Sequence, residues 1–267
     1  MRALPISRRT FLQLTGVAVM EREAFAERQS SGDSGVKALV FDVFGTVVDW
    51  RTSVSLEVQE LAKRKGIFVD GDKFADAWRA GYGPSMNRVR TGELPWTKLD
   101  DLHRMTLDRI LGEFNITSLS DEEKEALNKA WHRLRPWPDT VRGLFRLKKK
   151  FIIAPLSNGN IALMTDLAKH AALPWDCILG AELVRHYKPD REVYQSAADI
   201  LGLAPDAVMM VAAHLGDLRA AKAVGLRTAF VSRPLEYGPA GKPDLASDGL
   251  ADIDAKHFDD LAAKLGA

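Results

Sequence analysis

The sequence predicts an α/β fold in which a parallel sheet is interrupted by an all-helical insertion, and three observations support this prediction. From about residue 136 onward, apolar runs of strand length alternate with segments of helical periodicity. A further apolar run, at residues 37–41, stands apart near the start of the folded region. Between the two, from residue 53 to about residue 136, apolar residues recur only at helical spacing. Strands joined by helices form parallel sheets covered on both faces, so we expect a Rossmann-like core around the insertion.

The individual elements follow from these patterns in chain order. The first strand, from Lys37 to Phe41, ends at Asp42. Within the helical block, Ser120 followed by Glu123 predicts a capping box at the start of a helix. Later strands are expected at 151–156, 177–179, 208–211 and 228–231, and helices at 161–170, 192–201, 218–224 and 257–265. Pro155 weakens the prediction for the end of its strand, because proline has no N–H to donate to a sheet.

The composition is that of an ordinary globular protein. Of the 267 residues, 46% are hydrophobic and 27% are charged, which argues against disorder, a collagen-like fibre and a multi-pass membrane protein. The 37 basic and 36 acidic residues leave a net charge of +1, so no overall field favours nucleic acid or an anionic membrane as a partner. The single cysteine, Cys177, excludes an intramolecular disulfide, and no cysteine–histidine cluster suggests zinc.

The N-terminus has the features of an export signal. Ser7–Leu12 resembles the bacterial twin-arginine signature, an apolar stretch follows up to Met20, and Ala24–Ala26 offers a small-x-small cleavage pattern. We therefore interpret residues 1–35 as a signal peptide and linker, which predicts a periplasmic protein. The acidic segment Glu21–Glu23 interrupts this pattern. The alternative is a cytoplasmic protein with a polar tail, whose translation starts at Met20.

Polar residues follow several of the predicted strands, at the edge where parallel sheets bind their ligands. They are Asp42 after the first strand, Ser157 and Asn158 after the second, Lys188 in the loop Tyr187–Asp190, and the stretch from His214 to Asp217 after a later strand. Lysine and aspartate are almost never buried unpaired. We therefore expect Asp42, Lys188 and Asp217, all placed on loops, to form one network in the crevice.

These residues lie in segments that resemble the four motifs of the haloacid dehalogenase superfamily. The segments are Asp42–Val47, Leu156–Gly159, Tyr187–Pro189 and Gly216–Asp217. Their order and spacing match, and the match extends from about Val36 to the end of the chain. The resemblance implies a core domain of residues 36–52 and 136–267 and a helical cap domain of residues 53–135 that closes over the site. It also implies a homodimer, because members of the family are often dimers.

The position two after Asp42 separates activities within this superfamily. Its phosphatases resemble one another in carrying a second aspartate there, which protonates the leaving alcohol, whereas this chain has Phe44. A halide leaves without being protonated, so a dehalogenase can dispense with that acid. The chain therefore looks like a type II 2-haloacid dehalogenase. That family hydrolyses short (S)-2-haloacids to (R)-2-hydroxyacids with inversion, through an aspartyl ester and without a metal or organic cofactor.

The resemblance also implies a role for each matching residue. The nucleophile is Asp42, whose carboxylate Lys188 keeps ionised and oriented. The other matching residues bind the substrate carboxylate (Ser157 and the backbone amides of Val43 and Phe44), hold the departing halide (Arg79 and Asn158), or support the nucleophile and the pocket (Thr46 and Tyr194). Tyr82 and Trp96 are further candidates for the pocket lining.

The chain departs from the family pattern just before Asp217. The most familiar members have a serine and an asparagine there that position or activate the hydrolytic water, whereas this chain has Ala212 and His214. We expect His214, together with Asp217, to orient or deprotonate that water, because a neutral imidazole is suited to this task near pH 7.

Two other interpretations remain beside the dehalogenase. One is a magnesium-dependent phosphatase on the same fold, with Asp42 and Asp217 as metal ligands, against which Phe44 argues. The other is a non-catalytic relative that has kept the fold. The intact Asp42, Lys188 and Asp217 argue against the second interpretation, whereas Ala212 leaves room for it. The expected partner is a small 2-haloacid, with neither nucleic acid nor stable membrane insertion.

Overall fold

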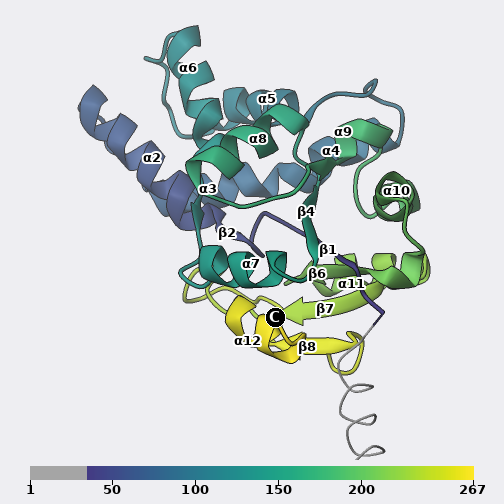
Figure 1. The fold of residues 1–267 in the computed structure, drawn as a ribbon. Coiled ribbons are helices and arrows are strands. Elements are labelled where there is room, and N and C mark those ends of the chain that lie inside the picture. Colours follow the sequence, from purple (N-terminus) through teal and green to yellow (C-terminus); the bar gives the residue numbers. More distant parts are fainter. Residues whose placement is uncertain (1–34) are drawn as a thin grey trace, which may run out of the picture. The chain divides into compact units, whose positions relative to one another are not determined.

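The computed structural model describes residues 35–267 (Figure 1). The predicted export signal and its cleavage pattern lie outside the described residues. In the part of the chain that is described, no helix combines the length and the apolar character needed to cross a membrane.

A parallel sheet forms the centre of the fold, which confirms the predicted α/β class. Within residues 35–267 it has six strands in the order β5-β4-β1-β6-β7-β8, and each neighbouring pair is parallel. The strands are β1 (Ala38–Phe41), β4 (Ile152–Ser157), β5 (Leu179–Gly180), β6 (Val208–Ala212), β7 (Arg227–Val231) and β8 (Ile253–Ala255). Because β1 lies between β4 and β6, the residues that follow these three strands meet at one edge of the sheet.

Helices cover both faces of this sheet. They are α7 (Thr140–Lys148), α8 (Ile161–His170), α9 (Ala181–Val184), α10 (Arg191–Leu201), α11 (Leu215–Ala223) and α12 (Phe258–Lys264), with the 3-10 helix η2 (Pro205–Ala207). Successive residues of β1 point to opposite faces. Leu39 and Phe41 pack in the apolar cluster that includes α7, α8 and α12, whereas Ala38 and Val40 pack in the cluster with α10 and α11. All four side chains are fully buried, which explains why the strand is a continuous apolar run in the sequence.

A helical segment separates β1 from β4. It consists of α2 (Trp50–Lys65), α3 (Gly71–Ala80), α4 (Tyr82–Arg90), α5 (Leu99–Glu113), α6 (Asp121–Asn128) and the 3-10 helix η1 (Lys129–His132), which lie near one another in the upper part of Figure 1. The predicted capping box is present, with Ser120 and Glu123 each accepting the backbone N–H of the other. Two short strands that the sequence did not predict, β2 (Val48–Asp49) and β3 (Arg135–Pro136), pair antiparallel where the chain enters and leaves this segment.

Pro155 does not end its strand: it lies inside β4, which continues to Ser157. The N–H of Ile152 donates to a carbonyl on the side of β1, so by alternation the missing N–H of Pro155 points away from β1. On that side β5 pairs only with Leu156 and Ser157. Pro155, which has no N–H to donate, thus lies directly before the first residue of β4 that pairs with β5.

Helix α11 begins earlier than predicted, at Leu215. The carboxylate of Asp244 accepts the N–H of Leu215 at 2.9 Å and so caps the first turn from a distant loop. Asp217 consequently lies in the first turn of a helix, and the expectation that it lies on a loop was wrong.

Close packing of α7 against α12 gives a first prediction. A Cβ added at Gly143 would lie 2.4 Å from the Cβ of Phe258 and 2.9 Å from its carbonyl carbon. We expect Gly143→Ala to lower the free energy of unfolding by about 1–3 kcal/mol, because backbone atoms have to shift to make room. Urea unfolding followed by circular dichroism measures this loss.

Gly112→Ala in α5 is the matched control for this variant. Nothing lies within 4 Å of a Cβ added at that position. Replacement of a helical glycine there should leave stability unchanged or raise it by up to about 1 kcal/mol. Equal stability of the two variants would contradict the tight contact at Gly143.

Candidate active site

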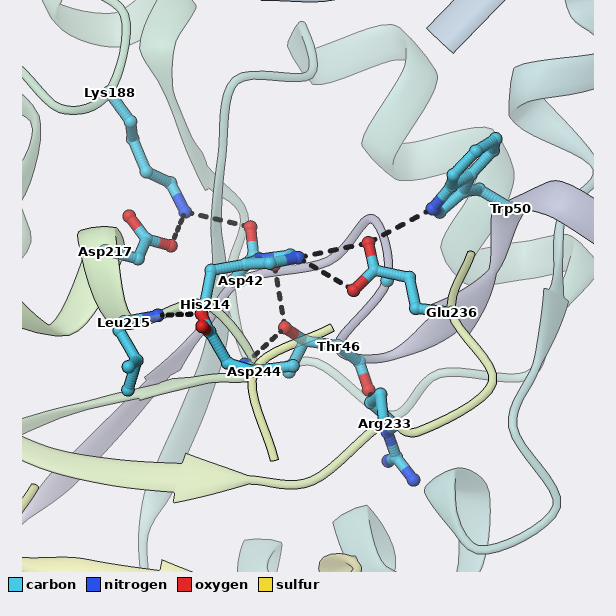
Figure 2. A network of polar contacts seen from close by, with 12 residues as sticks. Asp42, Thr46, Trp50, Lys188, His214, Leu215, Asp217, Arg233, Glu236 and Asp244 are labelled. Atoms are coloured by element: carbon cyan, nitrogen blue, oxygen red, sulfur yellow. Dashed lines mark hydrogen bonds and ion pairs between the residues drawn. The ribbon is translucent and has the colours of Figure 1, made fainter. Parts of the chain in front are cut away.

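The polar residues that follow β1, β4 and β6 converge at one edge of the sheet, as predicted. Asp42 comes directly after β1, and its N–H donates to the carbonyl of Val211 on β6 at 3.0 Å. His214 follows β6 and directly precedes α11, and Asn158 follows β4. Figure 2 shows the side chains of Asp42, Lys188, His214 and Asp217 directed toward one another.

Asp42 is the centre of this network. Its Oδ1 accepts a hydrogen bond from Lys188 Nζ at 3.0 Å, and its Oδ2 accepts from Thr46 Oγ1 at 2.7 Å and from His214 Nδ1 at 3.2 Å. Burial favours the neutral acid, but the charge of Lys188 and the hydrogen bonds from His214 and Thr46 outweigh it. Together they hold the pKa of Asp42 well below its usual range, so the carboxylate is ionised.

Thr46 donates its hydroxyl proton to Asp42, and its surroundings fix that direction. The backbone N–H of Ala213 donates to Thr46 Oγ1 at 2.9 Å, which leaves the hydroxyl proton free for the carboxylate. The backbone of Thr46 is held as well, because buried Arg233 donates to its carbonyl at 2.8 Å. Thr46 is thus a buried support behind the nucleophile.

Lys188 joins Asp42 to Asp217 through its ammonium group. Nζ lies 3.0 Å from Asp42 Oδ1 and 2.7 Å from Asp217 Oδ2, and the residue is only 8% exposed. Burial alone would lower the pKa of Lys188, but the two carboxylates raise it above its usual value. Asn158 fixes the loop, because its Oδ1 accepts the backbone N–H of Lys188 at 2.7 Å.

Asp217 has a second partner in Tyr194, whose hydroxyl donates to its Oδ1. Burial raises the pKa of Asp217 above its usual value, the neighbouring Asp42 carboxylate adds to this, and Lys188 acts against it. Burial also raises the pKa of Tyr194, so the phenol keeps its proton. A buried carboxylate of raised pKa is a better general base than an exposed one.

His214 lies between two carboxylates, in an arrangement that the sequence did not suggest. Its Nδ1 faces Asp42 Oδ2, and its Nε2 lies 3.0 and 2.9 Å from the two carboxylate oxygens of Glu236. Burial opposes the charged ring, but the hydrogen bonds to Asp42 and Glu236 outweigh it and raise the pKa of His214 to about 10. The imidazole is therefore charged near pH 7, in contrast to the neutral ring that was expected, and Asp217 is paired with Lys188 and Tyr194 instead.

A cavity of about 400 Å³ opens beside this network. Its lining includes eight of the predicted site residues: Asp42, Phe44, Arg79, Asn158, Lys188, Tyr194, His214 and Asp217. The other three, Val43, Thr46 and Ser157, are buried and are not among the residues that line it; Ser157 Oγ accepts the N–H of Gly159 at 3.1 Å. Among residues 35–267, no cluster of three or more His, Cys, Asp or Glu side chains is arranged to hold a metal ion.

Arg79 presents a cation to the cavity from helix α3. Its guanidinium carbon lies 4.1 Å from the ring centre of Tyr82, 5.3 Å from that of Trp50 and 6.0 Å from that of Phe44. Among the described residues, its buried Nη1 has no hydrogen-bond partner. A buried donor without a partner is costly, so this nitrogen is suited to receive an anion from the cavity.

Phe44 lies two positions after Asp42, where the phosphatases of the superfamily that the sequence resembles carry an aspartate. The side chain is 2% exposed, and its ring packs edge-on against Trp131 at 5.7 Å and Tyr82 at 6.2 Å between centroids. It supplies no proton to a leaving group.

Several residues of the site were missed by the sequence reasoning. Helix α4 contributes Met86, Asn87 and Arg90 to the lining beside Tyr82, whereas Trp96 packs on Tyr187 and is not part of the lining. The spacing of residues 82, 86 and 90 along one helix face could have indicated this. Glu236 was also missed, although it follows a predicted strand, β7, and the rule applied to the other strand ends covers it.

Comparisons with known proteins agree on one family. The model of the haloacid dehalogenase-like hydrolases matches residues 36–225. A crystal structure of a defluorinating L-2-haloacid dehalogenase is 49% identical, with a TM-score of 0.85 over 88% of this chain and 98% of that chain. A second L-2-haloacid dehalogenase structure is 48% identical, with a TM-score of 0.82 over 86% and 99%. The (S)-2-haloacid dehalogenase 4A of Burkholderia cepacia is 29% identical over 215 residues, which are 76% of this chain and 87% of that protein.

The raised pKa of His214 predicts a pH-dependent contribution to stability. A group whose pKa rises from 6.5 to about 10 on folding stabilises the protein fully below pH 6.5, and this contribution is lost as the pH rises through 10. Between pH 6.5 and about 10, the difference in unfolding free energy between the wild type and His214→Gln should therefore decrease by about 1.4 kcal/mol per pH unit. Urea unfolding of both proteins at a series of pH values measures it, and a constant difference would contradict the charged ring.

Proposed function

The chain belongs to the haloacid dehalogenase-like hydrolases, and we propose that it hydrolyses short (S)-2-haloacids to (R)-2-hydroxyacids. One observation carries the proposal: an ionised aspartate faces a cavity lined by an arginine whose Nη1 has no hydrogen-bond partner among the described residues, and an apolar ring stands two positions after that aspartate. The carboxylate is Asp42, the cation is Arg79, and Phe44 occupies the position of the acid. The names of the two relatives at 49% and 48% identity support the same reaction.

In the first step, a carboxylate oxygen of Asp42 attacks the halogen-bearing carbon from the side opposite the halogen. The bond from oxygen to carbon forms, the carbon–halogen bond breaks, and the halide leaves with the electron pair, so the carbon is inverted. We assign the attack to Oδ1, which accepts one hydrogen bond, from Lys188, whereas Oδ2 accepts two. The oxygen with fewer donors is the stronger nucleophile.

The leaving halide is stabilised by Arg79 and Asn158. The side-chain oxygen of Asn158 is occupied by the N–H of Lys188, so its remaining polar group is the NH₂, a donor. Both residues line the cavity. A cation and an amide donor beside the leaving group stabilise charge that develops in the transition state, and so they act on rate more than on binding.

The substrate carboxylate is assigned to the backbone N–H groups of Val43 and Phe44 and to the hydroxyl of Ser157. Ser157 Oγ accepts the N–H of Gly159, which leaves its own proton available for an anion. We further propose that residues 53–135 act as a cap over this site. Helix α4 of this segment lines the cavity, and its Arg90 forms an ion pair with Asp190 of the core at 2.6 Å.

In the second step, water attacks the carboxyl carbon of the ester at Asp42. Asp217 takes a proton from the water and returns it to the departing alkoxide, in keeping with its burial and raised pKa. The bond between the carboxyl carbon and Oδ1 breaks, so the product carries that oxygen and the oxygen of water stays on Asp42. The alternatives of a magnesium-dependent phosphatase and a non-catalytic relative are outcomes of the experiment below.

Halide release from both enantiomers of 2-chloropropionate, with EDTA present, tests this proposal. We expect release from the (S) enantiomer and none from the (R) enantiomer or from Asp42→Asn. A single turnover in ¹⁸O-water should place the label in the side chain of Asp42. Fluoroacetate is tested in parallel, since the relative at 49% identity is described as defluorinating. Absence of halide from every substrate would refute the proposal, and phosphatase activity that EDTA abolishes would favour the alternative.

Export and assembly complete the proposal and rest on the sequence alone. The paired arginines and the cleavage pattern at Ala24–Ala26 support export to the periplasm. Mass spectrometry of the native N-terminus tests this, with processing after Ala26 expected and an intact Met1 contradicting it. The homodimer implied by the family stays a prediction.

A further inference from the structure

Glu236 is buried beside the site, and the reaction as described gives it no role. It lies in the loop after β7, and the residue is 1% exposed. Its carboxylate accepts hydrogen bonds from His214 Nε2 at 3.0 and 2.9 Å and from Trp50 Nε1 at 3.2 Å (Figure 2). A buried carboxylate is costly unless it is paired, so this placement calls for an explanation.

The chain leaves space for this carboxylate at Gly45. The residue has a φ of +93°, which favours glycine, and a Cβ there would lie 2.1–2.9 Å from the carboxylate atoms of Glu236. Gly45 follows closely on Asp42 in the same loop, so the backbone next to the nucleophile accommodates Glu236.

The hydrogen-bond geometry of His214 favours a ring that carries a proton on both nitrogens. Its Nδ1 faces the carboxylate of Asp42, and its Nε2 lies 3.0 and 2.9 Å from the two carboxylate oxygens of Glu236, one of which also accepts the N–H of Trp50. A carboxylate can only accept, so each nitrogen has to donate, and a ring that donates from both nitrogens is an imidazolium.

Asp42 Oδ2 receives the Nδ1–H of His214 and the hydroxyl proton of Thr46. When Oδ1 forms the ester, Oδ2 becomes its carbonyl oxygen. We propose that His214 and Thr46 form the oxyanion hole for hydrolysis of this ester, and that Glu236 is the positioning residue that keeps His214 protonated and aimed at Oδ2. This inference rests on the proposed function and replaces the expectation that His214 is a base.

The step balances without any change in the protonation of His214. Water adds to the carboxyl carbon of Asp42 while Asp217 takes one of its protons, and the electrons of the C=O bond move to Oδ2. The oxyanion is stabilised by donors already in place. When the C=O bond re-forms, the bond to Oδ1 breaks and the alkoxide leaves with the proton from Asp217. The second proton of the water stays on the new carboxyl group of Asp42 and passes to solvent, which regenerates the carboxylate.

Glu236 matters most once the ester has formed, because Asp42 has then lost its charge. His214 faces two carboxylates directly, those of Asp42 and Glu236. Asp42 in turn contacts the Lys188–Asp217 pair, and Arg79 lines the same cavity. Arg233 and Tyr237 lie beside Glu236. In the ester, Glu236 is the carboxylate that remains in hydrogen-bond contact with the ring among the described residues. Burial would otherwise favour the neutral imidazole and remove the donor from Oδ2.

Glu236→Gln tests this role, with Asp244→Asn as the matched control. Asp244 is in the same loop region and accepts the N–H of Leu215, without a hydrogen bond to His214 among those described. We expect the pKa of His214, measured by NMR, to fall by roughly 1–3 in Glu236→Gln and to stay unchanged in Asp244→Asn. Glu236→Asp, which keeps the charge, should reverse part of this fall.

The kinetics should separate the two half-reactions. In Glu236→Gln, quenched samples should contain protein with the mass of the ester, because hydrolysis slows by about a hundredfold above the lowered pKa while alkylation continues. Both kcat and KM should fall, and kcat should decline with rising pH at a lower pH than in the wild type. A merely structural role would not move the pH at which this decline begins.

Three results would overturn the inference. They are an unchanged titration of His214 in Glu236→Gln, equal ester lifetimes in Glu236→Gln and Asp244→Asn, and a hydrolysis rate that rises as His214 loses its proton. If the wild type itself forms no ester from any haloacid, the proposed function fails and the oxyanion role with it. If only the effect of Glu236→Gln is missing, the proposed function stands and this inference fails. Should Glu236→Gln not fold, Glu236→Asp gives the same readouts with a smaller effect.

Discussion

The Lys188 ammonium group, held between Asp42 and Asp217, is the interaction on which the site depends. The two carboxylates come from the end of β1 and the first turn of α11, and without a cation between them they would repel each other in a buried setting. Asn158 fixes the backbone of Lys188, so four segments far apart in the sequence are tied together. The same ion pairs that assemble the site keep Asp42 ionised, which is the state that a nucleophile requires.

The charges of the side chains around Asp42 balance one another. Three carboxylates, Asp42, Asp217 and Glu236, are in contact with two cations, Lys188 and His214, and Arg79, which has no acidic partner among the ion pairs described, brings the sum of these charges to zero. Arg79 is therefore the cation of this set at which an anionic substrate can form a new ion pair. Apolar rings around that guanidinium, Phe44, Trp50 and Tyr82, exclude water and strengthen its field.

The sheet and most of the site could be predicted because they depend on local patterns. Buried strands are apolar runs in the sequence, and the polar residues that follow them, such as Asp42 and Asn158, meet wherever parallel strands end together. The start of α11 could not be predicted, because its cap, Asp244, comes from a distant loop. The charge state of His214 was missed because it depends on Glu236, which follows the predicted strand β7 and was not counted among the residues at the strand ends. The division into cap and core at residues 53 and 135 stays a prediction, supported by the pairing of β2 with β3.

The Arg90–Asp190 ion pair differs in kind from those beneath it. Both side chains are partly open to solvent, 38% and 19% exposed, and such pairs contribute about 0–1 kcal/mol and weaken with added salt. Separation of α4 from the loop that carries Lys188 therefore costs little free energy at this point, whereas the buried ion pairs around Asp42 remain formed. Added salt therefore loosens the edge of the cavity at Arg90 and Asp190, whereas the buried ion pairs around Asp42 keep their geometry. Entry of an anion should consequently depend on ionic strength more than its conversion at Asp42 does.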